Sequence, residues 1–236
     1  MDTHKKLILI PTVLSENTET VIPPYVKEIV ADIQYFIVEN SRTSRRYLRK
    51  IGFSKDFDKE VHFLDLSVQD STAQIKLFLK NLPEGHSIGV LSEAGCPSIA
   101  DPGAEVVKLA HSHGFEIIPL VGPSSILMAL ISSGMNGQGF TFNGYLPIEK
   151  SEKLKRIKEL EASALKTGYT QIFMETPYRN NALVKDIIDH CKEDMYLCIA
   201  ADITGEKQFI KSQRILNWKK DIPDIHKVPA VFCINF

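Results

Sequence analysis

The chain has 236 residues, 44% of them apolar, and a net charge of −1 from 28 Lys and Arg against 29 Asp and Glu. This composition is typical of a folded globular protein, and it excludes a disordered or fibrous chain. The near-neutral charge excludes nucleic-acid binding by bulk positive charge, but it permits a local basic surface. The length fits one large domain or two of about 110–120 residues each.

Neither a metal site nor a membrane segment is expected. The four cysteines form no CxxC pair and have no histidine at ligand spacing; they are Cys96, Cys191, Cys198 and Cys233. This spacing predicts no zinc site and no disulfide scaffold. The first residues contain an apolar run too short for a signal peptide, and prolines and glycine interrupt the uncharged stretch 117–135. We therefore expect a soluble cytoplasmic protein with no membrane partner and no metal.

In the first half of the chain, short apolar runs alternate with amphipathic segments of helical length. The expected strands are residues 7–10, 35–38, 61–64, 87–91 and 116–120. The expected helices cover about 24–32, 41–51, 71–82 and 103–113. Alternation of helices with near-continuous apolar strands predicts a parallel sheet that is covered on both faces.

The pattern changes after residue 120. We place a boundary there, between an N-terminal α/β domain, 1–120, and a C-terminal mixed α/β domain, 121–236. Helices are expected over about 123–133, 150–166 and 178–191, and strands near 140–143, 171–174 and 196–200. The tail is expected to form short antiparallel strands near 207–211, 213–217 and 230–235.

Several common catalytic motifs are missing. The first expected strand is followed by PTVLSENTE, without the glycines of a dinucleotide-binding turn. Glu39, at the end of the second strand, would suit a pair of ribose hydroxyls, but this interpretation is weak without those glycines. The chain has no GxxxxGK[ST], HExxH or GxSxG sequence, so P-loop, zincin and α/β-hydrolase chemistry lose their main support.

Two loops are rich in glycine, proline and small residues. The segment LSEAGCPSIADPG, 91–103, follows a buried strand, where small residues would let a ligand approach the backbone. Asp101 before Pro102 is also typical of a helix start, so Asp101 is either an N-cap or a ligand contact. The segment PLVGPSSI, 119–126, has the same character, and its serines either cap a helix or help to hold a ligand. Together the two loops predict a shared pocket.

Two arginine-containing segments stand out. Arg42, Arg45, Arg46 and Arg49 follow a strand at i, i+3, i+4 and i+7, on one helix face with no acid among them to pair with. Such a face either binds phosphate or is simply solvated. In METPYR, 174–179, Arg179 is expected in the first turn of a helix, where its charge opposes the helix dipole. A functional role is therefore as plausible there as a structural one.

These segments carry a resemblance to a known family. The chain resembles the tetrapyrrole (corrin/porphyrin) methylase superfamily, and within it the branch that methylates small-subunit ribosomal RNA on a cytidine ribose 2′-oxygen. The matching segments follow the family's order across nearly the whole chain. They are VENSR (38–42), SEAGCPSIADPG (92–103), VGPSS (121–125), FNGYLP (142–147), FMETPYR (173–179) and AADIT (200–204).

The resemblance implies an α/β, two-domain tetrapyrrole-methylase-like fold. The first domain would have a parallel sheet and the second a mixed sheet, with S-adenosylmethionine in the cleft between them, usually in a homodimer. The implied cofactor-binding residues are Pro11, Gly95, Cys96, Pro97, Ile99, Ala100, Ser124, Ser125, Ile126, Met174, Ala200, Pro229 and Ala230. The implied partner is ribosomal RNA or the small ribosomal subunit, and the RNA-binding residues would be Arg42, Arg45, Arg46, Arg49 and Arg179.

The chain also departs from the branch pattern. It has TVLSE, 12–16, in place of Pro-Ile-Gly-Asn-Leu, and Asn40, Tyr178 and Ala201 in place of Asp, His and Arg. These changes concern the methyl acceptor more than the cofactor. If the acceptor is a ribose hydroxyl, the protein must ease the loss of its proton, and a carboxylate near the cleft could serve as the base. The candidates are Glu39, Glu93 and Asp101, with Arg42 expected to hold Glu39 ionised.

Three functions remain open from the sequence. The first is a ribosomal RNA 2′-O-methyltransferase, which the arginine face favours. The second is a methyltransferase that acts on a tetrapyrrole or another small molecule. The third is a non-catalytic module that binds adenosylmethionine, since some family residues are replaced.

Overall fold

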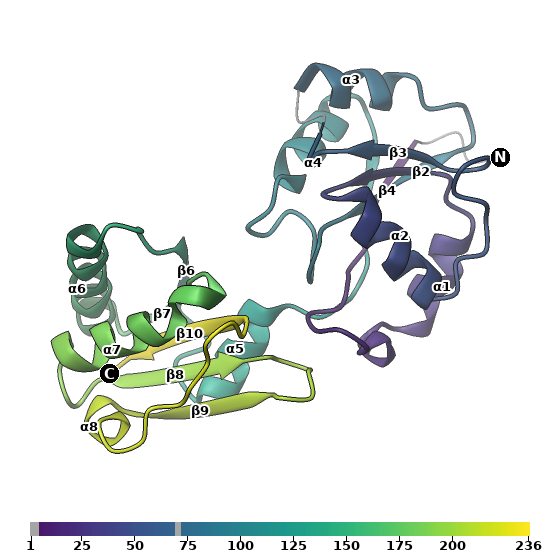
Figure 1. Cartoon of the computed structure of the whole chain (residues 1–236). Coiled ribbons are helices and arrows are strands. Elements are labelled where there is room, and N and C mark those ends of the chain that lie inside the picture. Colours follow the sequence, from purple (N-terminus) through teal and green to yellow (C-terminus); the bar gives the residue numbers. More distant parts are fainter. Residues whose placement is uncertain (1–4, 69–71) are drawn as a thin grey trace. The chain divides into compact units, whose positions relative to one another are not determined.

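The computed structural model describes residues 5–68 and 72–236, and the chain forms two compact units, Met1–Ser124 and Ser125–Phe236. Each unit is built around its own five-stranded sheet (Figure 1). The division into domains 1–120 and 121–236 stays a prediction.

The first unit contains a fully parallel sheet with the strand order β3-β2-β4-β1-β5. Its strands are β1 (Lys6–Leu9), β2 (Tyr35–Val38), β3 (His62–Asp65), β4 (Ser87–Leu91) and β5 (Glu116–Pro119). The predicted parallel sheet is therefore confirmed. The carboxyl ends of all five strands lie at one edge, which is where ligands usually bind to such a sheet.

Helices cover both faces of this sheet. The helices are η1 (Glu19–Val21), α1 (Pro24–Ala31), α2 (Ser41–Lys50), α3 (Thr72–Lys80) and α4 (Gly103–Ser112). Side chains of α1 and α2 pack with Phe36 and Ile10 in one cluster, while α3 and α4 pack with Ile37 and Ile88 in another. Ser71, the first residue of the predicted helix 71–82, lies outside the described residues.

The second unit contains a mixed sheet with the order β6-β7-β10-β8-β9. β6 pairs with β7 in parallel and the other neighbours are antiparallel, so the expected mixed sheet is confirmed. The strands are β6 (Phe140–Tyr145), β7 (Thr170–Met174), β8 (Tyr196–Ala201), β9 (Phe209–Arg214) and β10 (Ala230–Asn235). The helices are α5 (Ser125–Ser133), α6 (Lys150–Thr167), η2 (Pro177–Arg179), α7 (Asn180–His190) and α8 (Ile215–Trp218).

The prediction of two short strands at 207–211 and 213–217 is wrong. One strand, β9, runs from Phe209 to Arg214, and a short helix, α8, follows it. Burial explains the change, because the fully buried Trp218 ends α8 in the main core and its indole Nε1 donates to the Leu197 carbonyl at 3.0 Å. Tertiary packing has overridden the local alternation of the sequence.

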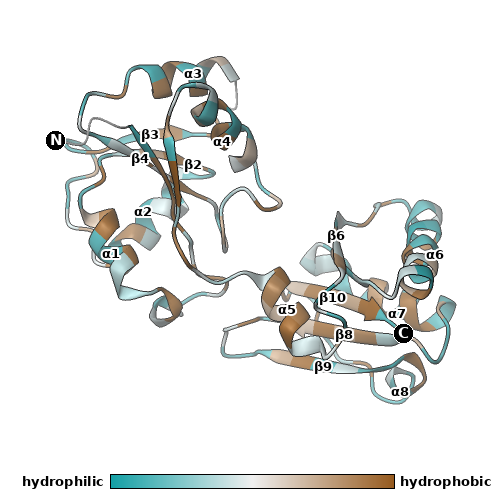
Figure 2. Cartoon of the chain, turned by 180° about the vertical axis from the view of Figure 1, so that it is seen from behind, coloured by the Kyte–Doolittle hydropathy of each residue, from teal (hydrophilic) through white to brown (hydrophobic). Residues whose placement is uncertain are grey.

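The two faces of the second sheet are covered differently. Phe173, Phe232 and Ile199 point into the core that includes side chains of α6, α7 and α8, while α5 packs on the opposite face. The apolar strands and the apolar α5 contrast with the polar outer surface of α6 (Figure 2). A buried ion pair, Lys153 Nζ to Asp186 Oδ2 at 2.7 Å, joins α6 to α7.

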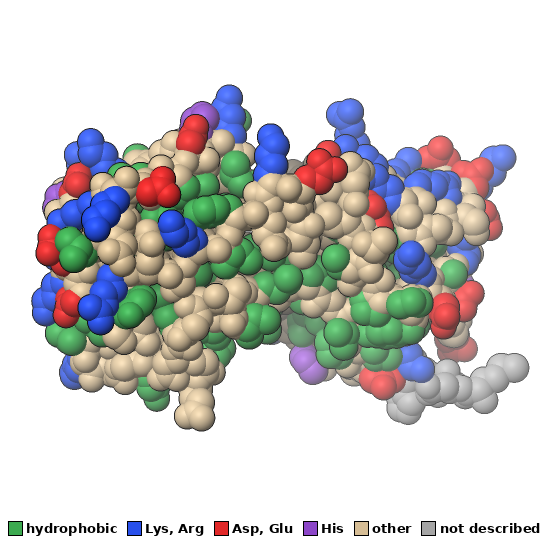
Figure 3. All heavy atoms as spheres, turned by 90° about the horizontal axis from the view of Figure 1, so that it is seen from below, with side chains coloured by type: hydrophobic (Ala, Val, Ile, Leu, Met, Phe, Trp, Pro, Cys, Tyr) green, Lys and Arg blue, Asp and Glu red, His purple; other side chains and the backbone are tan. Residues whose placement is uncertain are grey.

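The distribution of charge on the surface agrees with the near-neutral net charge of the chain. On the face in Figure 3, basic and acidic side chains are intermixed and form no broad region of one sign. Over the described ranges, no helix has both the length and the apolar character needed to cross a bilayer.

Candidate functional site

Three connections meet at the carboxyl edge of the first sheet. They follow β1, β4 and β5, which are neighbours in the sheet. The Thr12 amide donates to the Gly95 carbonyl at 2.8 Å, and the Cys96 Sγ lies 3.4 Å from the Pro123 carbonyl. The Tyr47 hydroxyl, from α2, donates to the Pro11 carbonyl at 2.7 Å. The two loops singled out in the sequence, which follow β4 and β5, therefore lie side by side. The segment after β1 joins them, because β1 lies between β4 and β5 in the sheet.

Two glycines make this close packing possible. A Cβ on Gly122 would lie 2.1 Å from the Cβ of Pro11, far inside van der Waals contact. Gly95 has a φ of +75°, and a Cβ there would lie 3.1 Å from Leu14 and 3.4 Å from the Pro123 carbonyl. A side chain at Gly122 would push apart the connections that follow β1 and β5. A side chain at Gly95 would strain the backbone, because φ is positive there.

Asp101 organises the loop that follows β4. Its Oδ1 accepts hydrogen bonds from the amides of Ser98, at 2.8 Å, and Gly103, at 2.7 Å. Helix α4 begins at Gly103, as predicted, but Pro102 occupies the N-cap position, so Asp101 lies one residue before the cap and its hydrogen bonds hold the loop. Ser98 and Ala100 have φ values of 73° and 61°. The two hydrogen bonds to Asp101 therefore hold a loop whose backbone is left-handed at two non-glycine residues. Asp101 Oδ2 and Ser98 Oγ are buried without a hydrogen-bond partner in the described structure.

A small group of carboxylates lies beside this loop. Glu39 Oε2 accepts the Glu93 amide at 2.9 Å, and Glu93 Oε1 accepts the Thr43 hydroxyl at 3.3 Å. Burial raises the pKa of Glu39; the Glu93 amide opposes the shift, and the charges of Glu93 and Asp101 add to it. The expectation that Arg42 stabilises the ionised form of Glu39 is wrong, because the Glu39 pKa is shifted upward and Arg42 is not among the groups that shift it.

Helix α2 starts beside these carboxylates. Asn40 is its N-cap, and its Oδ1 accepts the amides of Arg42, at 3.0 Å, and Thr43, at 3.2 Å. Asn40 therefore performs the capping role for which Asp is also suited. The cap places the exposed Arg42 one turn from the end of β2.

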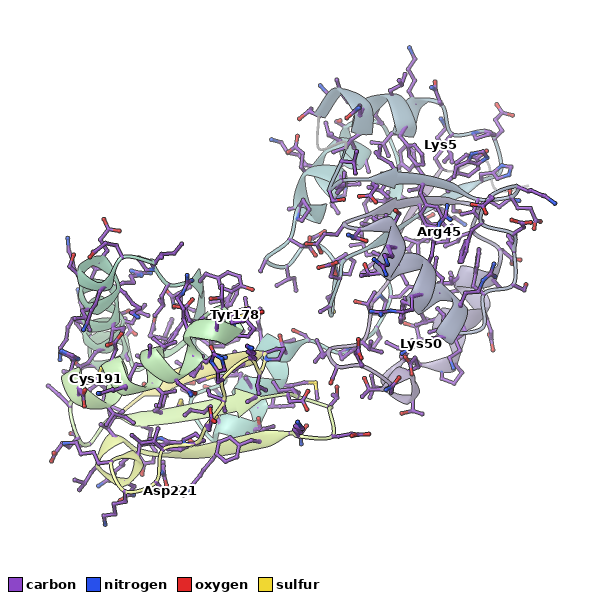
Figure 4. The ribbon with its side chains drawn as sticks, viewed as in Figure 1. Lys5, Arg45, Lys50, Tyr178, Cys191 and Asp221 are labelled. Atoms are coloured by element: carbon purple, nitrogen blue, oxygen red, sulfur yellow. The ribbon has the colours of Figure 1, made fainter. Side chains whose placement is uncertain are left out.

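The expectation that no acid pairs with the arginines of α2 is wrong. Arg45 pairs with Asp58 at 3.1 Å, and Arg46 lies 3.6 Å from Glu16. Arg45 also stacks near the rings of Phe57 and Phe63, and its position on α2 can be followed in Figure 4. Arg49 donates to the Phe53 carbonyl at 2.6 Å, and its guanidinium lies 4.0 Å from the ring centroid of Phe57. Two of the four arginines thus hold an aromatic cluster in place.

In the second unit, a row of three side chains crosses the sheet at the end of β7. Met174 pairs with Val231, and Val231 pairs with Ala200. Because Ala230 and Ala201 belong to the core on the other face, alternation places this row on the α5 side. The predicted Ala230 side chain is therefore in the core, and Val231, which the sequence reasoning missed, takes the corresponding position in the row. Counting the alternation along β10 identifies it.

Arg179 has a clear structural partner. Its Nε and Nη2 donate to Glu175 Oε1 at 2.9 and 2.6 Å, and Glu175 is only 2% exposed. This pairing raises the pKa of Arg179. The argument that Arg179 is poorly placed for stability is therefore wrong, because removing it would leave a buried carboxylate without its cation.

Comparison with known proteins reveals related sequences. No model of a protein family matches the chain. It is 34% identical over 174 residues to Ribosomal RNA small subunit methyltransferase I of Buchnera aphidicola subsp. Schizaphis graminum, covering 72% of this chain and 60% of that protein. It is 25% identical to the protein of the same name from Escherichia coli O157:H7, covering 98% of this chain and 77% of that one. For the Mesorhizobium japonicum protein of that name the identity is 39%, over 64% of this chain and 48% of the relative.

Solved structures show the same fold. The methyltransferase CobJ matches with a TM-score of 0.62 at 15% identity, over 98% of this chain and 94% of that chain. The cobalt precorrin-4 methyltransferase CbiF matches with a TM-score of 0.58 at 14% identity, over the same shares of the two chains. The chain therefore has the fold of these methyltransferases. Diphthine synthase has the fold as well, with a TM-score of 0.66 at 14% identity, over 97% of this chain and 88% of that one.

In residues 5–68 and 72–236, no three His, Cys, Asp or Glu side chains are grouped as a metal site would require. The carboxylates at Glu39, Glu93 and Asp101 are instead engaged with backbone amides and with the Thr43 hydroxyl.

The raised pKa of Glu39 leads to a first prediction. In an NMR titration, the Glu39 carboxyl should ionise above its ordinary value of 4.5, because burial and two negative neighbours penalise the charged form. Between 4.5 and that raised value the folded state binds the extra proton, so stability should fall as pH rises through this window. Replacing the neighbour, Glu93→Gln, should move the Glu39 midpoint down. A midpoint at or below 4.5 in the parent protein would contradict the electrostatic description.

Proposed function

We propose that the protein is an S-adenosylmethionine-dependent methyltransferase that methylates the 2′-oxygen of a cytidine ribose in small-subunit ribosomal RNA. The observation that carries the proposal is the similarity to several proteins named Ribosomal RNA small subunit methyltransferase I, one of which aligns over 98% of this chain. The alignment with the first of these relatives spans about 60% of that relative's length. The three connections at the carboxyl edge of the first sheet support the same proposal.

The connections of the first unit fit this cofactor. Gly122 leaves no room for a side chain against Pro11, and Asp101 Oδ2 is a buried acceptor without a partner in the described structure. Such a surface, with small residues and one free acceptor, suits a ligand that carries both a planar ring and an ammonium group. Adenosylmethionine supplies a methyl group on a sulfonium. The residues of this unit that would hold it are Pro11, Gly95, Cys96, Pro97, Ile99, Ala100 and Ser124.

The second unit would contribute through its own row of side chains. Met174 and Ala200 lie on the α5 face of the sheet, next to Val231. Pro229 fixes the start of β10, because its carbonyl accepts the Asp202 amide at 2.9 Å. We propose that Ala230 contacts the cofactor through its backbone only. Ser125 and Ile126 would contribute from the first turn of α5.

Of the candidate bases, the structure favours Glu39. Asp101 uses one carboxylate oxygen to hold the loop, and Glu93 accepts the Thr43 hydroxyl. A carboxylate with a raised pKa is better matched to taking a proton from a ribose hydroxyl than an ordinary one. We propose that Glu39 takes this proton while the exposed Arg42 orients the nucleotide through its phosphate.

The protein is also proposed to be a homodimer. The contact we propose is the stretch 140–146, which contains the edge strand β6, where Phe140 and Tyr145 are exposed. Leu146 belongs to the core and cannot contribute to such a contact. An edge strand with exposed aromatic rings suits an interface.

Transfer of a labelled methyl group tests the proposed activity. With adenosylmethionine labelled on its methyl, small ribosomal subunits lacking the modification should take up label at one cytidine, and that linkage should resist alkali because the 2′-oxygen is blocked. Gly95→Val should lose this activity, since the left-handed φ of +75° disfavours a branched residue. Label on a tetrapyrrole precursor but not on RNA would favour the small-molecule enzyme. Binding without transfer to either would favour a non-catalytic module.

Salt dependence of RNA binding tests the arginine face. Arg45 and Arg49 pack on aromatic rings, which leaves Arg42 and Arg46 as the candidates for phosphate contacts; the pairing of Arg46 with Glu16, at 3.6 Å, is exposed to solvent. Each phosphate contact releases counterions, so Arg42→Ala and Arg46→Ala should each flatten the slope of log affinity against log salt by roughly 0.7–1. Arg42→Ala should also reduce turnover more than affinity if Arg42 orients the reacting nucleotide.

Arg45→Ala is the matched control on the same helix. It should leave the salt slope nearly unchanged but lower the free energy of unfolding by about 1 kcal/mol, because Arg45 packs on Phe57 and Phe63. Parent and all three variants with equal slopes would rule out RNA binding by this face.

A further inference from the structure

Tyr178 is an exposed aromatic side chain in a position that packing does not explain. It lies in η2, the short helix that leads into α7, and its side chain can be seen there in Figure 4. The residue is 71% exposed, so its ring adds little to the buried core. Large aromatic rings left this open to solvent, with polar groups around them, often mark binding surfaces.

The segment beside Tyr178, residues 224–228, is fastened firmly to the same region. The Lys227 amide donates to the Pro177 carbonyl at 3.0 Å, and the fully buried Asn180 donates through Nδ2 to the Val228 carbonyl at 2.6 Å. Asn181 accepts the Ile225 amide at 3.0 Å. These bonds fix the backbone of two segments that are distant in sequence, so the side chains they carry have a defined arrangement.

Two nitrogen-bearing side chains of this segment flank the tyrosine ring. The His226 ring meets the Tyr178 ring edge to face, with centroids 6.1 Å apart, and the Lys227 Nζ lies 5.6 Å from the Tyr178 centroid. Lys227 has a φ of 62°, which a non-glycine residue rarely adopts. The hydrogen bond from its amide to the Pro177 carbonyl helps to hold this conformation. In the part of the chain that the structure describes, Lys227 has no ion-pair partner. The nearby Arg179, in contrast, is paired with Glu175.

An exposed ring with a cation beside it matches the chemistry of an unpaired nucleotide. A base can stack on the tyrosine face, while a phosphate can accept a hydrogen bond from the lysine ammonium. We infer that Tyr178, His226 and Lys227 form a platform that binds one unstacked nucleotide of the RNA substrate through its base and its phosphate. This inference rests on the proposed function and extends it to a surface of the second unit. The platform does not depend on Arg179, which is held by Glu175.

The test measures the affinity of the full chain for deproteinised RNA of a bacterial small ribosomal subunit over a range of salt concentrations. Tyr178→Ala should weaken binding roughly five- to a hundredfold, which is the usual effect of losing one aromatic stacking partner. Tyr178→Phe should bind like the parent, because it retains the ring. Lys227→Gln should weaken binding and flatten the salt slope by roughly 0.7, the value for one phosphate on a single strand.

Tyr196→Ala is the matched control. Tyr196 is also an exposed tyrosine with a cation over its ring, Arg214 at 5.5 Å, but it lies at the opposite end of the sheet, where β8 begins. This variant should bind RNA like the parent. Adenosylmethionine affinity, measured by calorimetry, should be unchanged in every one of these variants.

The outcomes separate the inference from the proposed function. If the parent binds and methylates RNA while Tyr178→Ala and Lys227→Gln bind as tightly as the parent, the platform is refuted and the proposed function stands. If Tyr178→Phe fails as badly as Tyr178→Ala, stacking is refuted as the mode of contact. If the parent neither binds nor methylates RNA, both the platform and the proposed function are refuted.

Discussion

The contact between Gly122 and the ring of Pro11 sets the shape of the proposed cofactor site. It allows the connection after β5 to lie directly against the connection after β1, and the Thr12 to Gly95 hydrogen bond then brings in the connection after β4. The Tyr47 hydroxyl ties α2 to the same point through the Pro11 carbonyl. The arginine helix and the three connections are therefore parts of one arrangement, in which a change at Pro11 would move all of them.

Two carboxylates near functional segments show how different surroundings give different roles. Glu175 is buried and receives two hydrogen bonds from Arg179, so it serves to position η2 and the residues next to it. Glu39 is only partly buried, and the charges that act on it, those of Glu93 and Asp101, are also negative. Glu175 is held by its cation, whereas burial and negative neighbours raise the pKa of Glu39. A raised pKa makes a carboxylate a better proton acceptor, which is why we propose Glu39 and not Glu175 as the base.

Local patterns in the sequence predicted most of the fold. The strands at 35–38 and 87–91 were predicted with the bounds that the structure has, because runs such as YFIV and SIGVL are apolar on both faces. The loops with Gly95 and Gly122 were also found, since turn residues after a strand are visible in the sequence. Alternation failed at α8, because the burial of Trp218 comes from residues far away in the chain.

Contacts distant in sequence explain the other errors. Nothing in the spacing of the α2 arginines reveals that Asp58, Glu16 and Phe57 would face them. The environment of Glu39 depends on a hydrogen bond to Glu93, 54 positions along the chain. For the same reason, His226 and Lys227 could not be connected to Tyr178 until the fold placed them together.

The most direct test of this account is the affinity of a Gly122→Ala variant for adenosylmethionine, measured by calorimetry beside Gly137→Ala. A Cβ at Gly122 would meet Pro11 at 2.1 Å, whereas one at Gly137 would meet no atom within 4 Å. If the close approach of these connections forms the cofactor site, Gly122→Ala should bind at least roughly tenfold more weakly, a loss of about 1.4 kcal/mol, while still unfolding cooperatively. Gly137→Ala should bind like the parent. Equal affinity of all three proteins would contradict the central claim.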